Sequence, residues 1–234
     1  MFPVSAPSAF RAASLLTALA CLSLLGGCAS LQTGQNKKNR LTPAQEQARL
    51  EHSFYRSLPG WKKSVHRNKA LLATASPENT SIEISIAEQR GLLLVDGAIA
   101  MDFPVATGKK THPTPTGSYT ILDKKKDYAS NLYGKIYDVA GTVVVQDADS
   151  RTDVIPEGGR FEGATMPYWM RLTTSGVGLH IGYVPGRPAS HGCVRLRKDV
   201  AAEIFDRVKL GTPVTIIQGP SALPAPSPTA PTTP

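Results

Sequence analysis

Short strand-length segments, separated by glycine and proline, dominate the middle of this 234-residue chain. Residues 81–86 place isoleucine at every second position, a period of two that is typical of a half-buried β-strand. A second apolar run ends at Asp96 and Gly97, a strong hairpin signal, and a third run follows it. Further strand candidates are residues 118–122, 142–145, 170–172, 177–181 and 213–217. The pattern predicts a mainly β domain over residues 78–218, built as a sandwich or a barrel-like sheet.

Helical signals precede this region. Pro43 suits the first position of a helix that runs to about Arg56, within a helical extension and linker over residues 42–77. Leu50 and Phe54 lie four residues apart on this helix, and we expect them to pack it on the domain.

Two histidines, a late helix and a tail complete this outline. His52 and His66 belong to no motif, and we expect both at the surface. A helix is predicted with Asp199 as its cap, an apolar stripe along one face, and Gly211 at its end. Residues 219–234 are rich in Pro, Ala, Ser and Thr, which predicts a disordered tail.

The first 27 residues have the pattern of a lipoprotein signal peptide. Their apolar run is shorter than the ~20 residues that a membrane-spanning helix needs. The run ends in Leu-Gly-Gly-Cys, which resembles a bacterial lipobox whose cysteine, Cys28, takes the lipid. Ala29 and Ser30, not aspartate, directly follow Cys28, and the resemblance to lipoproteins of Gram-negative cells then implies anchoring in the outer membrane, facing the periplasm. Residues 28–41 then form a tether, which together with the helical extension has a reach of ~3.3 Å per residue.

The formal net charge of +8 comes largely from short runs of lysine. Such runs suit solvated loops, and they also suit attraction to an anionic surface such as lipid headgroups or a carboxylate-bearing wall. No nucleic-acid motif is present and no aromatics alternate with the basic residues, so no nucleic-acid partner is expected. We expect a monomer.

The cysteines point to a reactive thiol. Cys21 and Cys28 belong to the leader, so Cys193 is the only cysteine of the predicted domain. A lone cysteine excludes an internal disulfide framework there. In an exported protein, it leaves a free thiol that invites a chemical role.

Residues 178–196 surround that thiol with potential partners. A free thiol is mostly protonated at neutral pH, so a nucleophilic role requires a base beside it. His180 can supply the base because the glycine- and proline-rich residues after it can return the chain to its side. His191 lies two residues before Cys193, so the two side chains point the same way in an extended segment.

The remaining residues of this stretch suit substrate contacts. The backbone N–H groups of Gly192 and Cys193 are candidates to hold an oxyanion. Arg195 can bind a substrate carboxylate through two hydrogen bonds. Ser190 can orient a histidine or stabilise a turn, and Tyr183 is a candidate for substrate contact.

The sequence Ser-His-Gly-Cys-Val-Arg at 190–195, with His180 upstream, resembles the signature of the L,D-transpeptidase catalytic domain. Residues 106–117 resemble the glycine- and proline-bounded loop of that family, and residues 166–170 resemble the segment that leads into its base-bearing strand. The resemblance extends over about residues 80–218. Two departures concern the substrate side: the loop after His180 is shorter than in many members, and the position of Arg195 is often asparagine.

The resemblance implies a function. Cys193 attacks the carbonyl of the third residue of a peptidoglycan tetrapeptide stem, and His180 takes the thiol proton and returns one to the departing D-alanine. A thioester forms, and an amine on a neighbouring stem resolves it into a 3→3 cross-link. No metal or organic cofactor is expected.

Several alternatives stay open on the sequence alone. Water, a lipoprotein or a free D-amino acid can replace the amine acceptor, and a non-catalytic wall-binding module can use the same groove. His180, His191 and Cys193 can also be considered as zinc ligands, although no fourth ligand accompanies them at a typical spacing. His112, in a Thr/Pro-rich loop, is interpreted as structural or peripheral.

Overall fold

The strands predicted for the middle of the chain are confirmed in the computed structural model, which describes residues 41–221. Strands β2 (Thr80–Ser85), β3 (Arg90–Val95) and β4 (Ala98–Ala106) pair antiparallel in sequence. Asp96 and Gly97 both have positive φ, 48° and 78°, as a tight two-residue hairpin requires.

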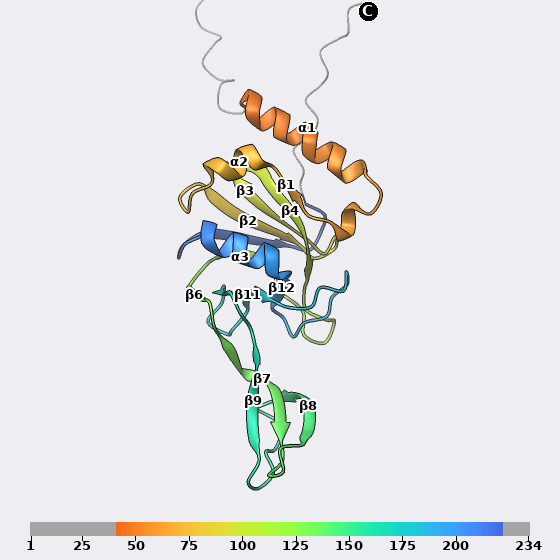
Figure 1. The fold of residues 1–234 in the computed structure, drawn as a ribbon, viewed down its shortest axis with the longest axis vertical. Helices are drawn as coiled ribbons and strands as arrows, with labels where there is room; N and C mark the ends of the chain where they lie inside the picture. The colour runs from red at the N-terminus through yellow and green to blue at the C-terminus, as the bar shows by residue number, and fades with distance from the viewer. Residues whose placement is uncertain (1–40, 222–234) are drawn as a thin grey trace, which may run out of the picture. The chain divides into compact units, whose positions relative to one another are not determined.

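Ten strands form one curled sheet (Figure 1), in the order β5-β13-β2-β3-β4-β12-β11-β10-β6, with β1 beside β4. Its other members are β1 (His66–Arg67), β5 (Gly117–Thr120), β6 (Asp123–Lys125), β10 (Trp169–Arg171), β11 (Gly178–Ile181), β12 (Val194–Leu196) and β13 (Pro213–Ile217). Only β11–β12 and β13–β2 pair in parallel within the described sheet. The prediction of a mainly β fold is therefore confirmed.

The predicted late helix is α3 (Lys198–Arg207), and its bounds differ from the expected ones. Arg197, not Asp199, occupies the cap position, and no side chain there bonds the helix end. The helix ends four residues before Gly211, which instead adopts a positive φ of 86° in the following turn. Its apolar stripe, Val200, Ala201, Ile204 and Phe205, packs into the core of the sheet.

The N-terminal extension is part of the folded body. It contains α1 (Pro43–Ser57), a 3₁₀ turn (Trp61–Lys63), β1 and α2 (Lys69–Thr74). The helix begins at Pro43 as predicted. Because β1 pairs with β4, residues 43–77 are held on the domain and do not lengthen a tether, contrary to expectation.

The buried face of α1 is not the predicted one. Leu50 and Phe54 are 50% and 67% exposed, whereas Ala48, His52 and Tyr55 are buried. The expectation that His52 lies at the surface is thus wrong. His66 is half-buried, with its ring centroid 5.6 Å from that of His52.

Asp102 of β4 explains why polar side chains face inward here. This fully buried carboxylate accepts hydrogen bonds from His52 Nε2 (2.7 Å), Arg56 Nε (2.8 Å) and Arg90 Nε (2.7 Å). Tyr55 adds a hydroxyl that bonds Arg90. Burial alone would raise the pKa of Asp102, but the bond from His52 and the two guanidinium charges hold that pKa below its usual value. We call these five residues the Asp102 cluster.

A second sheet projects from the body (Figure 1). It comprises β7 (Ala129–Tyr137), β8 (Val143–Asp149) and β9 (Arg160–Thr165) in the order β8-β7-β9. We call residues 129–165 the flap. Sequence reasoning predicted only the start of β8, because β8 and β9 are largely exposed and the three strands lack a regular period of two.

The body ends slightly later than predicted. Ser85 Oγ donates to the carbonyl of Gly219, and Ser221 N–H donates to Glu88, so residues 219–221 adjoin the domain. The lipid attachment at Cys28, the signal peptide and most of the Pro-rich tail lie outside the described residues.

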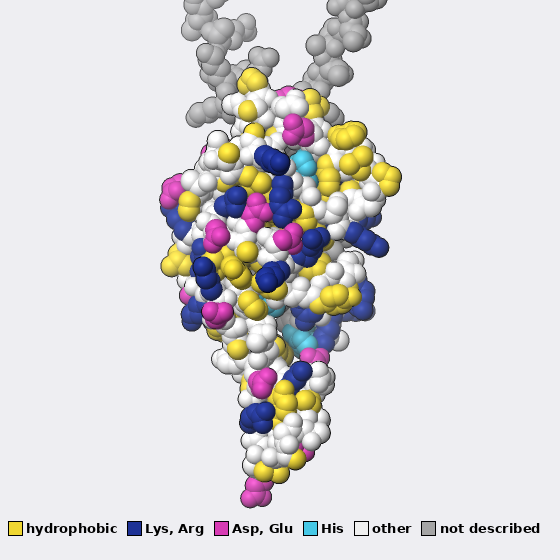
Figure 2. Space-filling model, viewed as in Figure 1, with side chains coloured by type: hydrophobic (Ala, Val, Ile, Leu, Met, Phe, Trp, Pro, Cys, Tyr) yellow, Lys and Arg dark blue, Asp and Glu magenta, His cyan; other side chains and the backbone are white. Residues whose placement is uncertain are grey.

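Charge is mixed on the visible face of the molecule (Figure 2). Basic and acidic side chains are interspersed on the face shown in Figure 2, and three surface lysines pair with carboxylates. Between residues 41 and 221, no helix is long and apolar enough to cross a membrane.

Candidate active site

Three adjacent strands form the floor of the site. One apolar residue from each of β10, β11 and β12 lies side by side across the strands. These residues, Met170, Leu179 and Val194, are fully buried in the core. Side chains alternate along a strand, so the neighbouring positions face the other way, toward the cleft.

Those outward positions form two rows across the strands. One row contains Trp169, His180 and Arg195. The other contains Arg171 and Gly178, and continuing the β11–β12 register by one residue brings Cys193 beside Gly178. His180 and Cys193 therefore lie on adjacent strands and on one face, offset by two residues, at a strand spacing of about 4.8 Å. The return of the chain that the sequence predicted is achieved by parallel pairing.

His180 is a neutral base. Its Nδ1–H donates to the carbonyl of Ile181 (2.7 Å), which leaves the lone pair on Nε2. The side chain is buried, with 7% of the residue exposed. Burial lowers the pKa of His180 to about 4, the bond to Ile181 opposes the shift and the charge of Arg195 adds to it.

Cys193 carries a protonated thiol in this arrangement. Its Sγ donates to the carbonyl of Gly176 at 3.5 Å. Burial raises the pKa of the thiol, while the Gly178 backbone and the charges of Arg195 and Arg171 act in the opposite direction. Thiol and imidazole are thus both neutral at pH 7, so a nucleophilic role for Cys193 would require its proton to move to a base during attack.

Ser190 and Gly192 shape the loop before the nucleophile. Gly192 has a φ of 111°, a conformation that side chains disfavour. Ser190 is buried, donates from Oγ to the carbonyl of Cys193 and accepts from Gly192 N–H (3.1 Å). The predicted oxyanion donor at Gly192 is therefore already bonded within the loop. Of the two predicted N–H groups, that of Cys193 remains, and Ser190 holds the loop.

Thr114 anchors the same loop from outside. Its hydroxyl donates to the carbonyl of Gly192 (2.8 Å) and accepts from Gly108 N–H (2.8 Å). Ser190 N–H in turn donates to the carbonyl of Thr107. The glycine- and proline-bounded loop singled out in the sequence thus supports the nucleophile segment.

His191 contacts the flap, away from the role predicted for it beside the thiol. Its ring stacks on Tyr133 (centroids 4.7 Å apart, planes 21° apart) and meets the edge of His112 at 4.8 Å. Its Nε2 lies 3.3 Å from a carboxylate oxygen of Asp147. Burial lowers the pKa of His191, and Asp147 opposes that shift.

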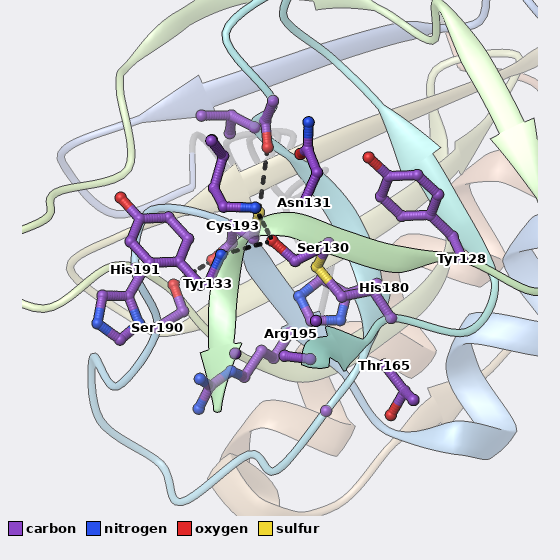
Figure 3. A pocket seen from close by; sticks show the side chains of 18 of the residues that line it. Tyr128, Ser130, Asn131, Tyr133, Thr165, His180, Ser190, His191, Cys193 and Arg195 are labelled. Carbon is purple, nitrogen blue, oxygen red and sulfur yellow. Dashed lines mark hydrogen bonds between the residues drawn. The ribbon is translucent and has the colours of Figure 1, made fainter. Parts of the chain in front are cut away.

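Arg195 and Tyr183, the two residues predicted to contact substrate, line the cleft. The aliphatic stem of Arg195 lies over Gly182, where a Cβ would come within 2.8 Å of it, so a larger residue at Gly182 would displace the guanidinium. Tyr183 is 76% exposed at the rim. Figure 3 shows Arg195 and Tyr128 on opposite sides of His180.

The flap, together with Tyr128 directly before it, supplies the cleft residues that sequence reasoning missed. The cleft measures about 730 Å³ and lies between the floor strands and the flap. Tyr128 stacks on Trp169 (4.9 Å) and Tyr133 on His191. The sequence marks neither tyrosine, because each is brought to the site only by flap pairing. Among residues 41–221, no cluster of three His, Cys, Asp or Glu has a geometry that could hold a metal.

Comparisons with known proteins agree with this geometry. Residues 79–216, more than half of the chain, match the model of the YkuD family, described as the L,D-transpeptidase catalytic domain. L,D-transpeptidase 1 of Mycobacterium tuberculosis is 33% identical over 132 residues, which cover 52% of this chain and 44% of that protein. The chain thus matches less than half the length of this relative.

A solved structure of an L,D-transpeptidase from Mycobacterium smegmatis is also similar. It has 26% identity and a TM-score of 0.45, and the match covers 59% of this chain and 58% of that one. The family match includes β2 to β13, and with them His180, Cys193 and both rows of the floor. This chain therefore belongs to the YkuD family of L,D-transpeptidase catalytic domains.

Proposed function

We propose that this protein is an L,D-transpeptidase that acts on peptidoglycan stem peptides through a thioester on Cys193. The observation that carries the proposal is the placement of Cys193 and His180 on one face of two parallel strands, with the His180 lone pair on Nε2. Membership of the family supports the choice of reaction, and the open cleft above both residues accommodates a peptide.

Acylation combines two proton transfers with one exchange of bonds. His180 Nε2 takes the thiol proton as Cys193 Sγ bonds to the carbonyl carbon of the third stem residue. The oxyanion forms beside the Cys193 N–H. When the intermediate collapses, the peptide C–N bond breaks, and imidazolium returns the proton to the departing amine of D-alanine.

Deacylation repeats the sequence with a new nucleophile. An acceptor amine attacks the thioester carbonyl and loses a proton to His180, which then protonates the departing thiolate of Cys193. With the side-chain amine of diaminopimelate on a neighbouring stem, the product is a 3→3 cross-link. Water as acceptor gives a carboxypeptidase, and a lipoprotein amine or a free D-amino acid gives attachment or exchange.

Intact-mass spectrometry tests the proposal directly. The full chain and Cys193→Ala are incubated with a tetrapeptide-stem muropeptide, and both protein and peptide masses are followed. We expect a thioester adduct, loss of D-alanine and 3→3 dimers, all absent from the variant. Tripeptide without dimers would favour the carboxypeptidase. Identical behaviour of both proteins would overturn the catalytic proposal and favour a wall-binding module.

We further propose that the protein is a lipoprotein anchored through Cys28 in the outer membrane and facing the periplasm. The support is the Leu-Gly-Gly-Cys sequence at the end of a short apolar leader, with no aspartate after it. Such an anchor keeps the enzyme near its polymeric substrate. Metabolic labelling with an alkyne fatty acid, followed by membrane fractionation, should label the wild type in the outer membrane. Labelling that persists in Cys28→Ala would contradict the assignment.

A further inference from the structure

Arg171 lies in the same row as the nucleophile. It pairs with Gly178 across β10 and β11, and Cys193 follows on the far side of Gly178. Two strand spacings separate the backbones of Arg171 and Cys193, or about 10 Å. That distance is within reach of an arginine side chain together with a residue bound to the sulfur.

Neighbouring aromatic residues hold the Arg171 side chain at the cleft. Its Nη2 donates to the hydroxyl of Tyr128 (3.4 Å), and its guanidinium carbon lies 5.7 Å from the centre of the Trp169 ring. Trp169 itself lies over Gly178, where an added Cβ would come within 2.6 Å of the indole. Glycine at 178 therefore leaves room for the buried indole of Trp169, beside which the Arg171 guanidinium lies at the cleft.

Arg171 lacks a carboxylate partner. Within the described part of the chain, neither Arg171 nor Arg195 makes a salt bridge, although both line the cleft. Other partly buried arginines, including Arg56, Arg67 and Arg90, are paired with acids. An unpaired guanidinium in a cleft is suited to a planar anion from a ligand, because its N–H groups match a carboxylate.

The two arginines face different parts of a bound donor. His180 protonates the leaving amine, and Arg195 shares its row, so Arg195 is next to the leaving residue. Arg171 shares the row of the sulfur on the opposite side, next to the retained acyl part. The leaving residue of the donor peptide has its own terminal carboxylate. The retained acyl part has a second carboxylate if the side chain of the third residue is carboxylated.

We propose that Arg171 binds a side-chain carboxylate on the acyl part of the donor and thereby selects the third residue. This rests on the proposed function and assigns the chemical class that the site accepts: a third residue with a carboxylate on its side chain. A carboxamide at that position, or a side chain without a carboxylate, fits the site less well. Arg195 contacts the leaving residue and does not bind this side-chain carboxylate.

The test compares two donor tetrapeptides that differ only in a carboxylate or carboxamide on the third side chain. The rate of thioester formation on the full chain is measured by intact mass for each donor. Because a hydrogen bond to a charged group is involved, we expect the wild type to prefer the carboxylate by about 10- to 100-fold. Arg171→Gln should lose the preference by slowing only with the carboxylate donor.

Three further variants make the result specific. Arg195→Gln should keep the preference while slowing both donors. Arg197→Gln is the matched control, since Arg197 is exposed and outside the cleft, and it should behave as wild type. Arg171→Lys retains a positive charge and should keep part of the preference, which also serves if Arg171→Gln fails to fold.

The outcomes separate this assignment from the reaction itself. Equal rates of the wild type with both donors, or an Arg171→Gln variant that slows both donors alike, would overturn the assignment while leaving the transpeptidase intact. A wild type that forms no thioester with either donor would overturn the proposed function, and the assignment with it.

Discussion

The cleft and the Asp102 cluster each bury a histidine, and they use it in opposite ways. His180 gives one ring nitrogen to a backbone carbonyl and keeps a lone pair on the other. His52 directs a ring nitrogen to the fully buried Asp102, where two arginines also converge. Burial is shared, so it does not mark a catalytic histidine. The difference is that His180 lies on an open cleft beside a nucleophile, whereas the partners of His52 satisfy one another.

Replacing His180 should produce the largest effect on activity. His180→Gln removes the base that takes the thiol proton, and we expect thioester formation to slow by about 10²- to 10⁴-fold. His52→Gln, the matched change in the other region, should leave the rate within a few-fold once folding is confirmed. Stopped reactions analysed by intact mass measure both. A comparable loss of rate in His52→Gln would break the distinction between the two histidines.

Replacing Asp102 should produce the largest effect on stability. Asp102→Asn leaves Arg90 buried without a countercharge and leaves Arg56 with Glu88 alone, and such a loss costs about 3–5 kcal/mol. Asp123→Asn is the control, because its pair with Lys125 is largely exposed and such pairs contribute about 0–1 kcal/mol. Urea unfolding at pH 7 gives both values. A loss below about 1 kcal/mol for Asp102→Asn would show that the cluster is dispensable.

The cleft and the Asp102 cluster should lose their contributions to stability at different pH values. Between pH 6.5 and about 4 the unfolded chain binds a proton at His180 that the folded chain does not, so stability falls as pH falls. From pH 7 to 4.5 we expect a loss of about 2–3 kcal/mol that is absent from His180→Gln. Asp102, with its lowered pKa, is fully effective above the usual value near 3.8 and loses its contribution only at lower pH. Urea titrations of the wild type, His180→Gln and Asp102→Asn at pH 7, 4.5 and 3 measure the loss of stability in the two pH ranges. If His180→Gln loses as much stability at pH 4.5 as the wild type does, the loss does not come from His180.

The outer face of α1 should be the least sensitive. Phe54 is 67% exposed, so Phe54→Ser should change the free energy of unfolding by no more than about 0.5 kcal/mol. Tyr55→Ala, one residue later, removes a buried ring and its bonds to Trp61, Ser64 and Arg90, and should cost about 3 kcal/mol or more. Thermal unfolding of the two variants, measured beside the wild type, gives both changes in stability. Equal losses would mean that Phe54 is buried in solution.

These differences also explain what sequence could predict. The isoleucine alternation and the Asp96-Gly97 turn are local, so β2 to β4 were predictable. The segment around Cys193 was recognisable as a motif. In α1, the apolar residues point outward and the polar ones inward because Asp102, 46 residues away from Arg56, decides the buried face. The spacing of apolar residues within α1 does not indicate which face of the helix is buried. The aromatic residues of the flap and Arg171 were missed for the same reason, because their position depends on strand pairing.

Parallel pairing of β11 with β12 has a consequence for how the site can change. Parallel neighbours need a crossover of about a dozen residues or more, and here residues 182–193 connect them. The ladder, which the Gly182 N–H extends by donating to the carbonyl of Leu196, fixes His180 opposite the Cys193 segment, and residues 183–188 contribute no pairing to that alignment. Insertions or deletions between Gly182 and Ala189 can therefore remodel the cleft rim without disturbing the reacting pair. We therefore expect changes in the length or sequence of this loop to alter selectivity while the reacting pair is kept.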